Sequence, residues 1–341
     1  MRFGLHLSIS GRLANAAVHG KALGCQALQI FPGNPRGWEK APFDPAQVAE
    51  FRTTVKSAQL DPVVVHATYL INLAAPDADI YKKSCTTFFD ELERTASLGA
   101  AFYVIHSGSH KGTGEVPARA RIQAALKEAQ ACGLTGKPGQ PMVLFENTAG
   151  TANSLGTTFE DLAALLDGPG LPDAGVCFDT CHALAAGYEI RTKDGVTETL
   201  TKFDKSVGLK RLRCLHVNDS KGALGSRIDR HEHIGEGELG AKGFAAFLAD
   251  ERVWNLPAIL ETPQDESDDC RRNLRRIVEL ACAAGALSTA ARDLVSAKPE
   301  APATPASKKK VAKKSAPKAI PKVKAKSAKA APARTKGKKA R

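Results

Sequence analysis

The sequence predicts an α/β fold, a TIM (β/α)8 barrel, and two observations support this prediction. Eight short runs rich in Val, Ile, Leu and Phe alternate with longer stretches of helical spacing, as βα units around a parallel sheet do. Seven of the eight runs end on His, Asp or Glu. In such a barrel the carboxyl ends of all strands open onto one face, so these side chains would meet in a single site.

The predicted strands are short, and turn or loop residues bound each of them. They cover residues 3–6, 27–31, 63–66, 102–106, 142–146, 175–179, 212–216 and 258–261. The residues that close seven of them are His6, His66, His106, Glu146, Asp179, His216 and Glu261. Polar residues that merely begin loops could explain two or three such ends, but Ser, Asn, Lys or Gly would then occur at least as often.

Predicted helices occupy the stretches between the strands, where apolar residues recur with helical spacing. They cover residues 46–58, 83–98, 115–131, 158–166, 197–207 and 241–249, and a final helix runs from about 268 to 284. We therefore expect one barrel domain over residues 1–288.

The charge of the chain is concentrated at its C-terminus. From Lys298 to Arg341 there are 16 Lys or Arg residues and one acid, Glu300, whereas the remainder carries 32 basic and 35 acidic residues. Residues 297–341 consist largely of Ala, Lys and Pro and cannot form a core, so they are predicted to be disordered. Such a tail binds DNA without sequence preference, although a solubilising or RNA-binding extension is the alternative.

Composition also bounds the cellular compartment. The eight cysteines are scattered without a CxxC pair, and no apolar run approaches the roughly 18 residues of a membrane span. Polar residues interrupt the N-terminal stretch, which argues against a signal peptide. We expect a monomer in the reducing cytoplasm, associated with the nucleoid and without membrane contact. The nucleus is the alternative, because Lys-rich clusters such as 308–310 serve in nuclear targeting.

Nine residues are predicted to bind metal. Six close strands and three lie in loops: His66, His106, Glu146, Asp179, His216 and Glu261, then His182, Asp229 and His231. Imidazole and carboxylate ligands without thiolates suit zinc, manganese or iron, and five imidazoles favour zinc. Nine ligands are too many for one tetrahedral ion but suit two or three. Such a cluster can generate a nucleophile and neutralise a leaving oxygen, as phosphodiester hydrolysis requires.

The stretch 175–182 holds two of these residues close together. Asp179 ends a strand and His182 follows three residues later. From spacing alone, the two side chains could bind one ion together or two neighbouring ions separately. Cys177 and Cys181 lie in the same stretch and are predicted to pack as reduced, buried thiols.

Several stretches resemble the signatures of endonuclease IV, the zinc-dependent family of apurinic/apyrimidinic (AP) endonucleases. They are 66–72 (HATYLIN), 145–150 (FENTAG), 175–188 (GVCFDTCHALAAGY), 216–221 (HVNDSK), 225–237 (GSRIDRHEHIGEG) and 260–262 (LET). The resemblance spans about residues 2–285. It implies a TIM barrel that cuts duplex DNA on the 5′ side of an abasic site and leaves a 3′-hydroxyl and a 5′-deoxyribose phosphate.

The resemblance further implies three Zn²⁺ ions per chain. Their ligands would form three sets: His66, His106 and Glu146; Glu146, Asp179, His216 and Glu261; and His182, Asp229 and His231. Glu146 would bridge the first two ions, with a hydroxide between them as nucleophile, and Glu146 and Glu261 are the expected catalytic residues. The third ion would hold the phosphate, so Asp179 and His182 would serve different ions.

The same resemblance implies DNA contacts. Enzymes of this family bend DNA and flip the abasic sugar out of the stack. The matching positions here are Arg36, within 34–38 (NPRGW), and Tyr69 and Leu70 in the first signature. Ser107 and Thr151 depart from the usual signatures, which affects loop shape but no predicted ligand.

Two other functions fit parts of the pattern. Metal-dependent sugar isomerases and epimerases also gather Glu, Asp and His at strand ends, but they need only one or two metals, which leaves Asp229 and His231 without a role. An architectural DNA-binding protein with an inactive barrel would not need the full ligand set. The stretch 235–240 fits GxGxxG, but no strand precedes it, so we expect no dinucleotide site there.

Overall fold

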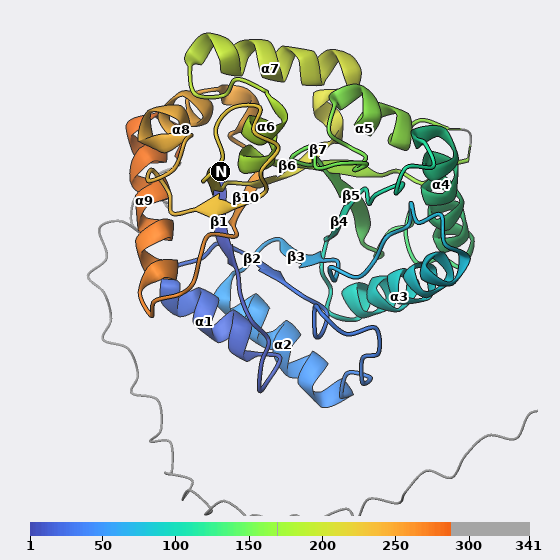
Figure 1. The fold of residues 1–341 in the computed structure, drawn as a ribbon. Helices are drawn as coiled ribbons and strands as arrows, with labels where there is room; N and C mark the ends of the chain where they lie inside the picture. The colour runs from blue at the N-terminus through green and yellow to red at the C-terminus, as the bar shows by residue number, and fades with distance from the viewer. Residues whose placement is uncertain (169, 288–341) are drawn as a thin grey trace, which may run out of the picture. The chain divides into compact units, whose positions relative to one another are not determined.

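A computed structural model describes residues 1–168 and 170–287 of the protein. Eight parallel strands form a closed barrel, and helices surround it (Figure 1). The strands are β1 (Arg2–His6), β2 (Ala27–Ile30), β3 (Val63–His66), β4 (Phe102–His106), β5 (Met142–Glu146), β6 (Gly175–Asp179), β7 (Leu212–His216) and β10 (Pro257–Leu260). The predicted TIM barrel is confirmed. The predicted tail, residues 297–341, lies outside the described residues.

The strands follow one another around the barrel in chain order, and β1 closes the ring between β2 and β10. Gly4 of β1 lies opposite Ala27 of β2. A Cβ atom at Gly4 would lie 2.2 Å from the carbonyl oxygen of Ala27, so this close approach requires glycine. Two observed strands end one residue earlier than predicted: β2 ends before Phe31, and β10 ends before Glu261.

Alternate residues of each strand point into the barrel. One interior layer is apolar and fully buried: Ala27, Val64, Val104, Leu144, Cys177, Cys214 and Ile259. The residue two positions further along each of these strands faces the same interior, one layer closer to the carboxyl ends of the strands. The functional side chains stand in that next layer.

Nine helices lie in the described part of the chain. They are α1 (Asn15–Leu23), α2 (Pro45–Ala58), α3 (Ala78–Ser97), α4 (Glu115–Ala131), α5 (Phe159–Leu166), α6 (Thr180–Ala186), α7 (Lys193–Ser206), α8 (Gly240–Leu248) and α9 (Asp269–Ala283). Helix α6 was not predicted. Helix α3 begins earlier than predicted because Asp77 caps it, accepting hydrogen bonds from the backbone N–H groups of Asp79 and Ile80. No helix of residues 1–287 that the structure describes is long and apolar enough to cross a membrane.

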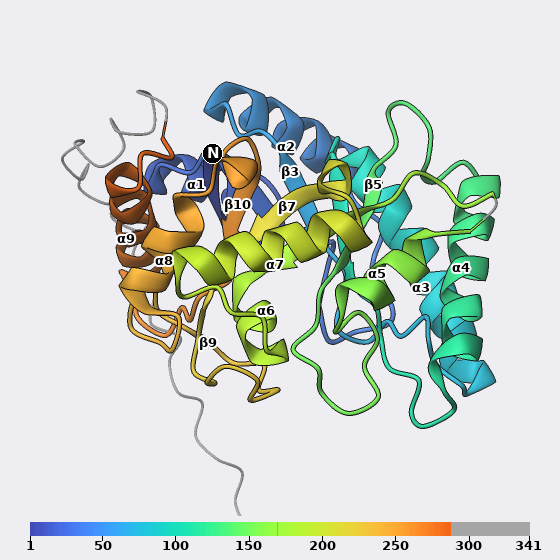
Figure 2. The ribbon, with the colours of Figure 1, turned by 90° about the horizontal axis from the view of Figure 1, so that it is seen from above.

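A short antiparallel pair, β8 (Asp219–Ser220) and β9 (His231–Glu232), follows β7 and was also not predicted. Helix α6 packs against β8, and Figure 2 shows β9 at the same end of the barrel as α6. The buried carboxylate of Asp219 accepts hydrogen bonds from the N–H groups of Gly235, Gly237, Leu239 and Gly240. The GxGxxG stretch therefore surrounds a carboxylate of the chain itself, which explains the motif without a nucleotide.

Candidate metal centre

A layer of polar side chains lies directly above the apolar interior layer. Each of the eight barrel strands supplies one member, at its end or just after it: His6, Gln29, His66, His106, Glu146, Asp179, His216 and Glu261. Seven members follow a residue of the apolar layer by two positions, and His6 follows Gly4 of β1 in the same way, so the pleat of each strand aims them into the barrel. Six of the nine predicted ligands belong to this layer.

Glu146 is fully buried at the centre of the polar layer. Four imidazole nitrogens surround its carboxylate: His66 Nε2 at 3.3 Å, His106 Nε2 at 3.1 Å, His182 Nδ1 at 3.2 Å and His216 Nδ1 at 3.0 Å. One carboxylate thus connects residues from β3, β4, β7 and α6.

The nine predicted ligands form three groups. Within each group, one nitrogen or oxygen atom per residue lies within 4.8 Å of the others: His66, His106 and Glu146; Glu146, Asp179, His216 and Glu261; and His182, Asp229 and His231. These groups coincide with the three ligand sets that the sequence resemblance implies. Glu146 belongs to two of them, as a bridging carboxylate would.

Four of these histidines direct one nitrogen to an oxygen acceptor. The bonds are His66 Nδ1 to Ala67 O (2.7 Å), His182 Nδ1 to Asn147 O (2.9 Å), His231 Nδ1 to Glu261 O (2.9 Å) and His216 Nε2 to Gln29 Oε1 (2.9 Å). A neutral imidazole carries a single N–H, so its other nitrogen presents a lone pair. These lone pairs face carboxylate oxygens, and such an arrangement is repulsive unless a cation stands between the two.

The pKa values reflect this crowding of opposite charges. Burial alone would raise the pKa of Glu146, but His216 and His106 hold it well below its usual range. Burial would likewise lower the pKa of His216, yet the carboxylates of Glu261 and Glu146 raise that pKa to about 10. The carboxylate of Glu146 therefore stays ionised, and its surroundings attract either protons or metal ions.

The donor atoms of the nine predicted ligands fit zinc. His182 Nε2 and His231 Nε2 are buried nitrogens that make no hydrogen bond, although Asp229 Oδ1 lies 3.0 Å from His182 Nε2. Buried polar atoms without a hydrogen bond are rare, and a cation is one way to satisfy them. Imidazole nitrogen and carboxylate oxygen are both common ligands of zinc.

Two cysteines also approach predicted ligands. Cys177 lies near His216, and Cys181 lies near Asp179 and His231. Burial raises the pKa of Cys181 to about 12 and the pKa of Cys177 well above its usual range. Because metal ligation requires the thiolate, both thiols are better suited to packing. All eight cysteines are free, as the sequence predicted.

Asp179 also caps the N-terminus of helix α6. Its Oδ1 accepts a hydrogen bond from the backbone N–H of His182 (2.7 Å), and its Oδ2 accepts one from Asn218 Nδ2 (2.6 Å). Asn147 holds the backbone of Asp179 from the other side, with its Oδ1 2.7 Å from the Asp179 N–H nitrogen. Neither asparagine was predicted to be a residue of the site.

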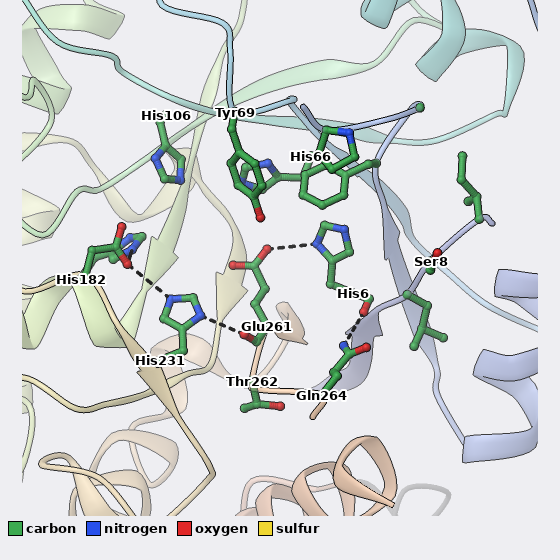
Figure 3. A pocket seen from close by; sticks show the side chains of 16 residues that line it. His6, Ser8, His66, Tyr69, His106, His182, His231, Glu261, Thr262 and Gln264 are labelled. Carbon is green, nitrogen blue, oxygen red and sulfur yellow. Dashed lines mark hydrogen bonds and ion pairs between the residues drawn. The ribbon is translucent and has the colours of Figure 1, made fainter. Parts of the chain in front are cut away.

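The polar layer opens into a cavity of about 500 Å³ (Figure 3). Six predicted ligands line it: His66, His106, His182, Asp229, His231 and Glu261. Phe31, Pro35 and Tyr69 complete part of the wall. The ring of Phe31 lies edge-on to both His66 and Tyr69, with ring centroids 5.7 Å and 5.2 Å apart.

The three predicted DNA contacts differ in their positions. Tyr69 lines the cavity and is 65% exposed, whereas Arg36 and Leu70 are not among the lining residues. Arg36 is exposed on the loop before α2. The backbone N–H of Tyr69 donates to Pro35 O (3.2 Å), so the two loops that carry these residues are joined.

Sequence reasoning missed Gln29 as a member of the polar layer and left His6 outside the ligand set. The signal was present, because Gln29 stands two residues after the interior Ala27.

Two further histidines make hydrogen bonds outside the polar layer. His110 Nδ1 accepts hydrogen bonds from the N–H groups of Gly112 and Gly114, and His233 Nδ1 lies 3.0 Å from Asn273 Nδ2.

Comparison with known proteins gives a consistent result. Residues 19–281 match the family described as xylose isomerase-like TIM barrel. The chain is 44% identical over 280 residues to a protein of Methanoculleus marisnigri named "Probable endonuclease 4", covering 82% of this chain and 98% of that one. A protein of the same name from Geobacter sulfurreducens is 41% identical, with 81% and 94% of the two chains covered.

Solved structures agree with these relatives. The crystal structure of endonuclease IV from Thermus thermophilus superposes with a TM-score of 0.73 at 37% identity, covering 83% of this chain and all of that one. A D-tagatose 3-epimerase-like protein superposes with a TM-score of 0.61, covering 83% of this chain and 99% of that one. It is only 18% identical, so this second likeness establishes the barrel fold alone.

Proposed function

Since the chain belongs to the endonuclease IV family of xylose isomerase-like TIM barrels, we propose that it hydrolyses the phosphodiester bond on the 5′ side of abasic sites in duplex DNA. The chain is a deoxyribonuclease of a metal-dependent DNA repair family. The proposed products are a 3′-hydroxyl and a 5′-deoxyribose phosphate.

The arrangement of the nine ligand residues in three groups carries this proposal. Two of the groups share Glu146, and the third is built on His182, Asp229 and His231. We assign one zinc ion to each group, which gives three per chain. A metal-dependent sugar isomerase or epimerase on the same barrel would have no use for the third group, and no feature of the site favours that alternative.

Zinc ions at these positions would supply a water-derived nucleophile and neutralise charge on the phosphate and the leaving oxygen. Glu146 and Glu261 are the proposed catalytic residues, because their carboxylates would hold the ions that act on the reacting atoms. The hydrogen bonds from Nδ1 of His66, His182 and His231 to backbone carbonyl oxygens fix the orientation of each ring before a metal ion binds.

The size of the cavity suits a single nucleotide. A cavity of about 500 Å³ admits a sugar with its phosphate rather than a duplex, so the abasic sugar has to leave the stack. The ring of Phe31 lies edge-on to His66, with ring centroids 5.7 Å apart, and forms part of this wall. We propose that Tyr69, Leu70 and Arg36 contact the DNA around the extruded sugar.

A duplex with a single tetrahydrofuran abasic analogue tests the proposal, because this analogue cannot undergo β-elimination. The full-length protein is incubated with the duplex, and bound zinc is measured on the same preparation. Incision 5′ to the analogue, a 3′-hydroxyl end that a polymerase extends, and about three zinc ions per chain are expected. Intact DNA with fully loaded protein would overturn the proposal, and epimerisation of a ketose in a parallel assay would favour the sugar enzyme.

A further inference from the structure

Gln29 is the one amide in the polar layer, and it is fully buried. It lies on β2 opposite His6 of β1, and β1 in turn pairs with β10, after which Glu261 follows. All of the polar contacts of its side chain stay within the layer: Nε2 to Glu261 Oε1 (2.6 Å), Nε2 to His6 Nδ1 (3.0 Å) and Oε1 to His216 Nε2 (2.9 Å).

The two ends of this amide are not interchangeable. Gln29 Nε2 donates a hydrogen bond to Glu261 Oε1 over 2.6 Å, so the NH₂ group of the amide faces this carboxylate. Turning the amide over would place two oxygens against each other at 2.6 Å. The hydrogen bond to Glu261 therefore fixes Gln29 Oε1 on the side of His216, 2.9 Å from His216 Nε2.

An oxygen at that place determines which nitrogen of His216 carries a proton. Gln29 Oε1 accepts the proton of Nε2, so the nitrogen left for a metal ion is Nδ1. His216 Nδ1 lies 3.0 Å from Glu146 Oε1 and 3.3 Å from Glu261 Oε2, within the four-residue group. One amide thus orients two ligands of the same group, an imidazole through its oxygen and a carboxylate through its nitrogen.

We propose that Gln29 is a positioning residue for the zinc ion of the group Glu146, Asp179, His216 and Glu261. The inference rests on the proposed function, since it presumes a metal ion at this group. Without Gln29 the buried Nε2–H of His216 loses its acceptor, and Glu261 loses a charge-assisted hydrogen bond. Ligands held in this way bind their metal about 10–100-fold more tightly than ligands without such partners.

The test compares Gln29→Met with a matched control, Gln123→Met, in the full-length protein. Gln123 lies on α4, outside the polar layer, and its amide donates to the backbone carbonyls of Ala164 and Asp167. Zinc affinity is measured by competition with a chromophoric chelator. For Gln29→Met we expect one of three zinc ions to bind about 10–100-fold more weakly, while Gln123→Met keeps all three.

Kinetics on the tetrahydrofuran duplex give a second readout. Gln29→Met should lower kcat and leave KM for DNA unchanged, and added free zinc should restore much of the lost rate. A residue that only fills space would not produce rescue by zinc. If Gln29→Met does not fold, Gln29→Asn takes its place, because the amide remains but is one methylene too short to reach both partners.

The outcomes separate this inference from the proposed function. Wild-type protein that binds no zinc or leaves the duplex intact sinks the proposed function itself. Wild-type activity with three zinc ions, together with unchanged zinc affinity in Gln29→Met, overturns only the role of Gln29. Equal zinc loss in Gln29→Met and Gln123→Met would also overturn it, because the loss would then reflect general destabilisation.

Discussion

The backbone N–H of His182 donates a hydrogen bond to Asp179 Oδ1 over 2.7 Å, so one carboxylate both caps helix α6 and faces the candidate metal centre. The other oxygen of Asp179 accepts a hydrogen bond from Asn218 Nδ2, and Asp179 belongs to the group with Glu146, His216 and Glu261. Capping and ligation can be separated by substitution, because serine caps a helix about as well as aspartate does but carries no charge.

We therefore expect Asp179→Ser and Asp179→Ala to lose the same zinc ion but to differ in stability. Loss of the cap should make the Ala variant about 1 kcal/mol less stable than the Ser variant. Zinc content and urea unfolding of the metal-free proteins measure the two effects. Full zinc content in Asp179→Ser would remove this residue from the ligand set, and equal stability would show that the cap contributes nothing.

Glu261→Gln removes one charge from the same group and changes the shape of the side chain little. We expect kcat for incision to fall roughly 100-fold or more, which corresponds to about 3 kcal/mol of lost transition-state stabilisation. The fold should be retained, as circular dichroism and thermal unfolding would show. Glu128→Gln, on the exposed face of α4, is the control. Wild-type activity in Glu261→Gln would remove Glu261 from the catalytic residues.

The period of two in the strands made most of the ligand set predictable. Val64 and His66 illustrate the rule: an interior apolar residue is followed, two positions on, by a polar residue at the carboxyl end. Gln29 obeys the same rule after Ala27. It was missed because the predicted strand extended to Phe31, so Gln29 did not end it. In addition, the prediction considered only titratable residues, and an amide does not titrate.

Other parts of the site could not be predicted from sequence patterns. The strands β8 and β9 are two residues long, too short for any periodic pattern. Helix α6 follows β6 without a loop and is only seven residues long, so it carries little helical periodicity. Its local signals are the caps at its two ends, Asp179 and Gly187. The hydrogen bonds of Asn147 and Asn218 depend on tertiary structure and could not be read from local sequence.

A buried ion pair anchors the loop that carries Arg36. Lys40 Nζ lies 2.8 Å from Glu91 Oε1, and the two side chains are 2% and 0% exposed. Glu91 also accepts hydrogen bonds from the Oγ1 of Thr68 (2.8 Å) and the hydroxyl of Tyr103 (2.7 Å). The pair therefore ties the loop before α2 to the segment that leads to Tyr69.

Lys40→Met should destabilise the protein by about 3–5 kcal/mol, because it leaves the Glu91 carboxylate buried without a countercharge. The double variant Lys40→Met/Glu91→Gln should recover part of this loss, since no unpaired charge remains. Chemical denaturation of the single and double variants measures the coupling. Lys56→Met, on the exposed side of α2, should change stability by less than about 0.5 kcal/mol. A similarly small effect at Lys40 would contradict the structural role of the pair.

Cys177 and Cys181 should prove to be packing residues. Both thiols are fully buried, and alanine at either position leaves a small cavity that costs roughly 1 kcal/mol of stability. Zinc content should remain at the wild-type level in both variants, measured by atomic emission on desalted protein. Cys132→Ala provides the control, because this thiol is exposed. Loss of a zinc ion in Cys177→Ala or Cys181→Ala would show that a thiolate takes part in binding.

The basic tail offers the last prediction. It lies outside the described residues, and its 16 Lys and Arg residues suggest that it tethers the barrel to DNA. Truncation before Lys298 should leave kcat at saturating substrate unchanged and weaken binding to a duplex without a lesion. The slope of log K against log salt should become shallower, by about 0.9 for each phosphate that the protein no longer neutralises. A full-length variant with the tail lysines changed to glutamine should behave like the truncated chain. Equal affinity and equal slope with and without the tail would contradict the tether.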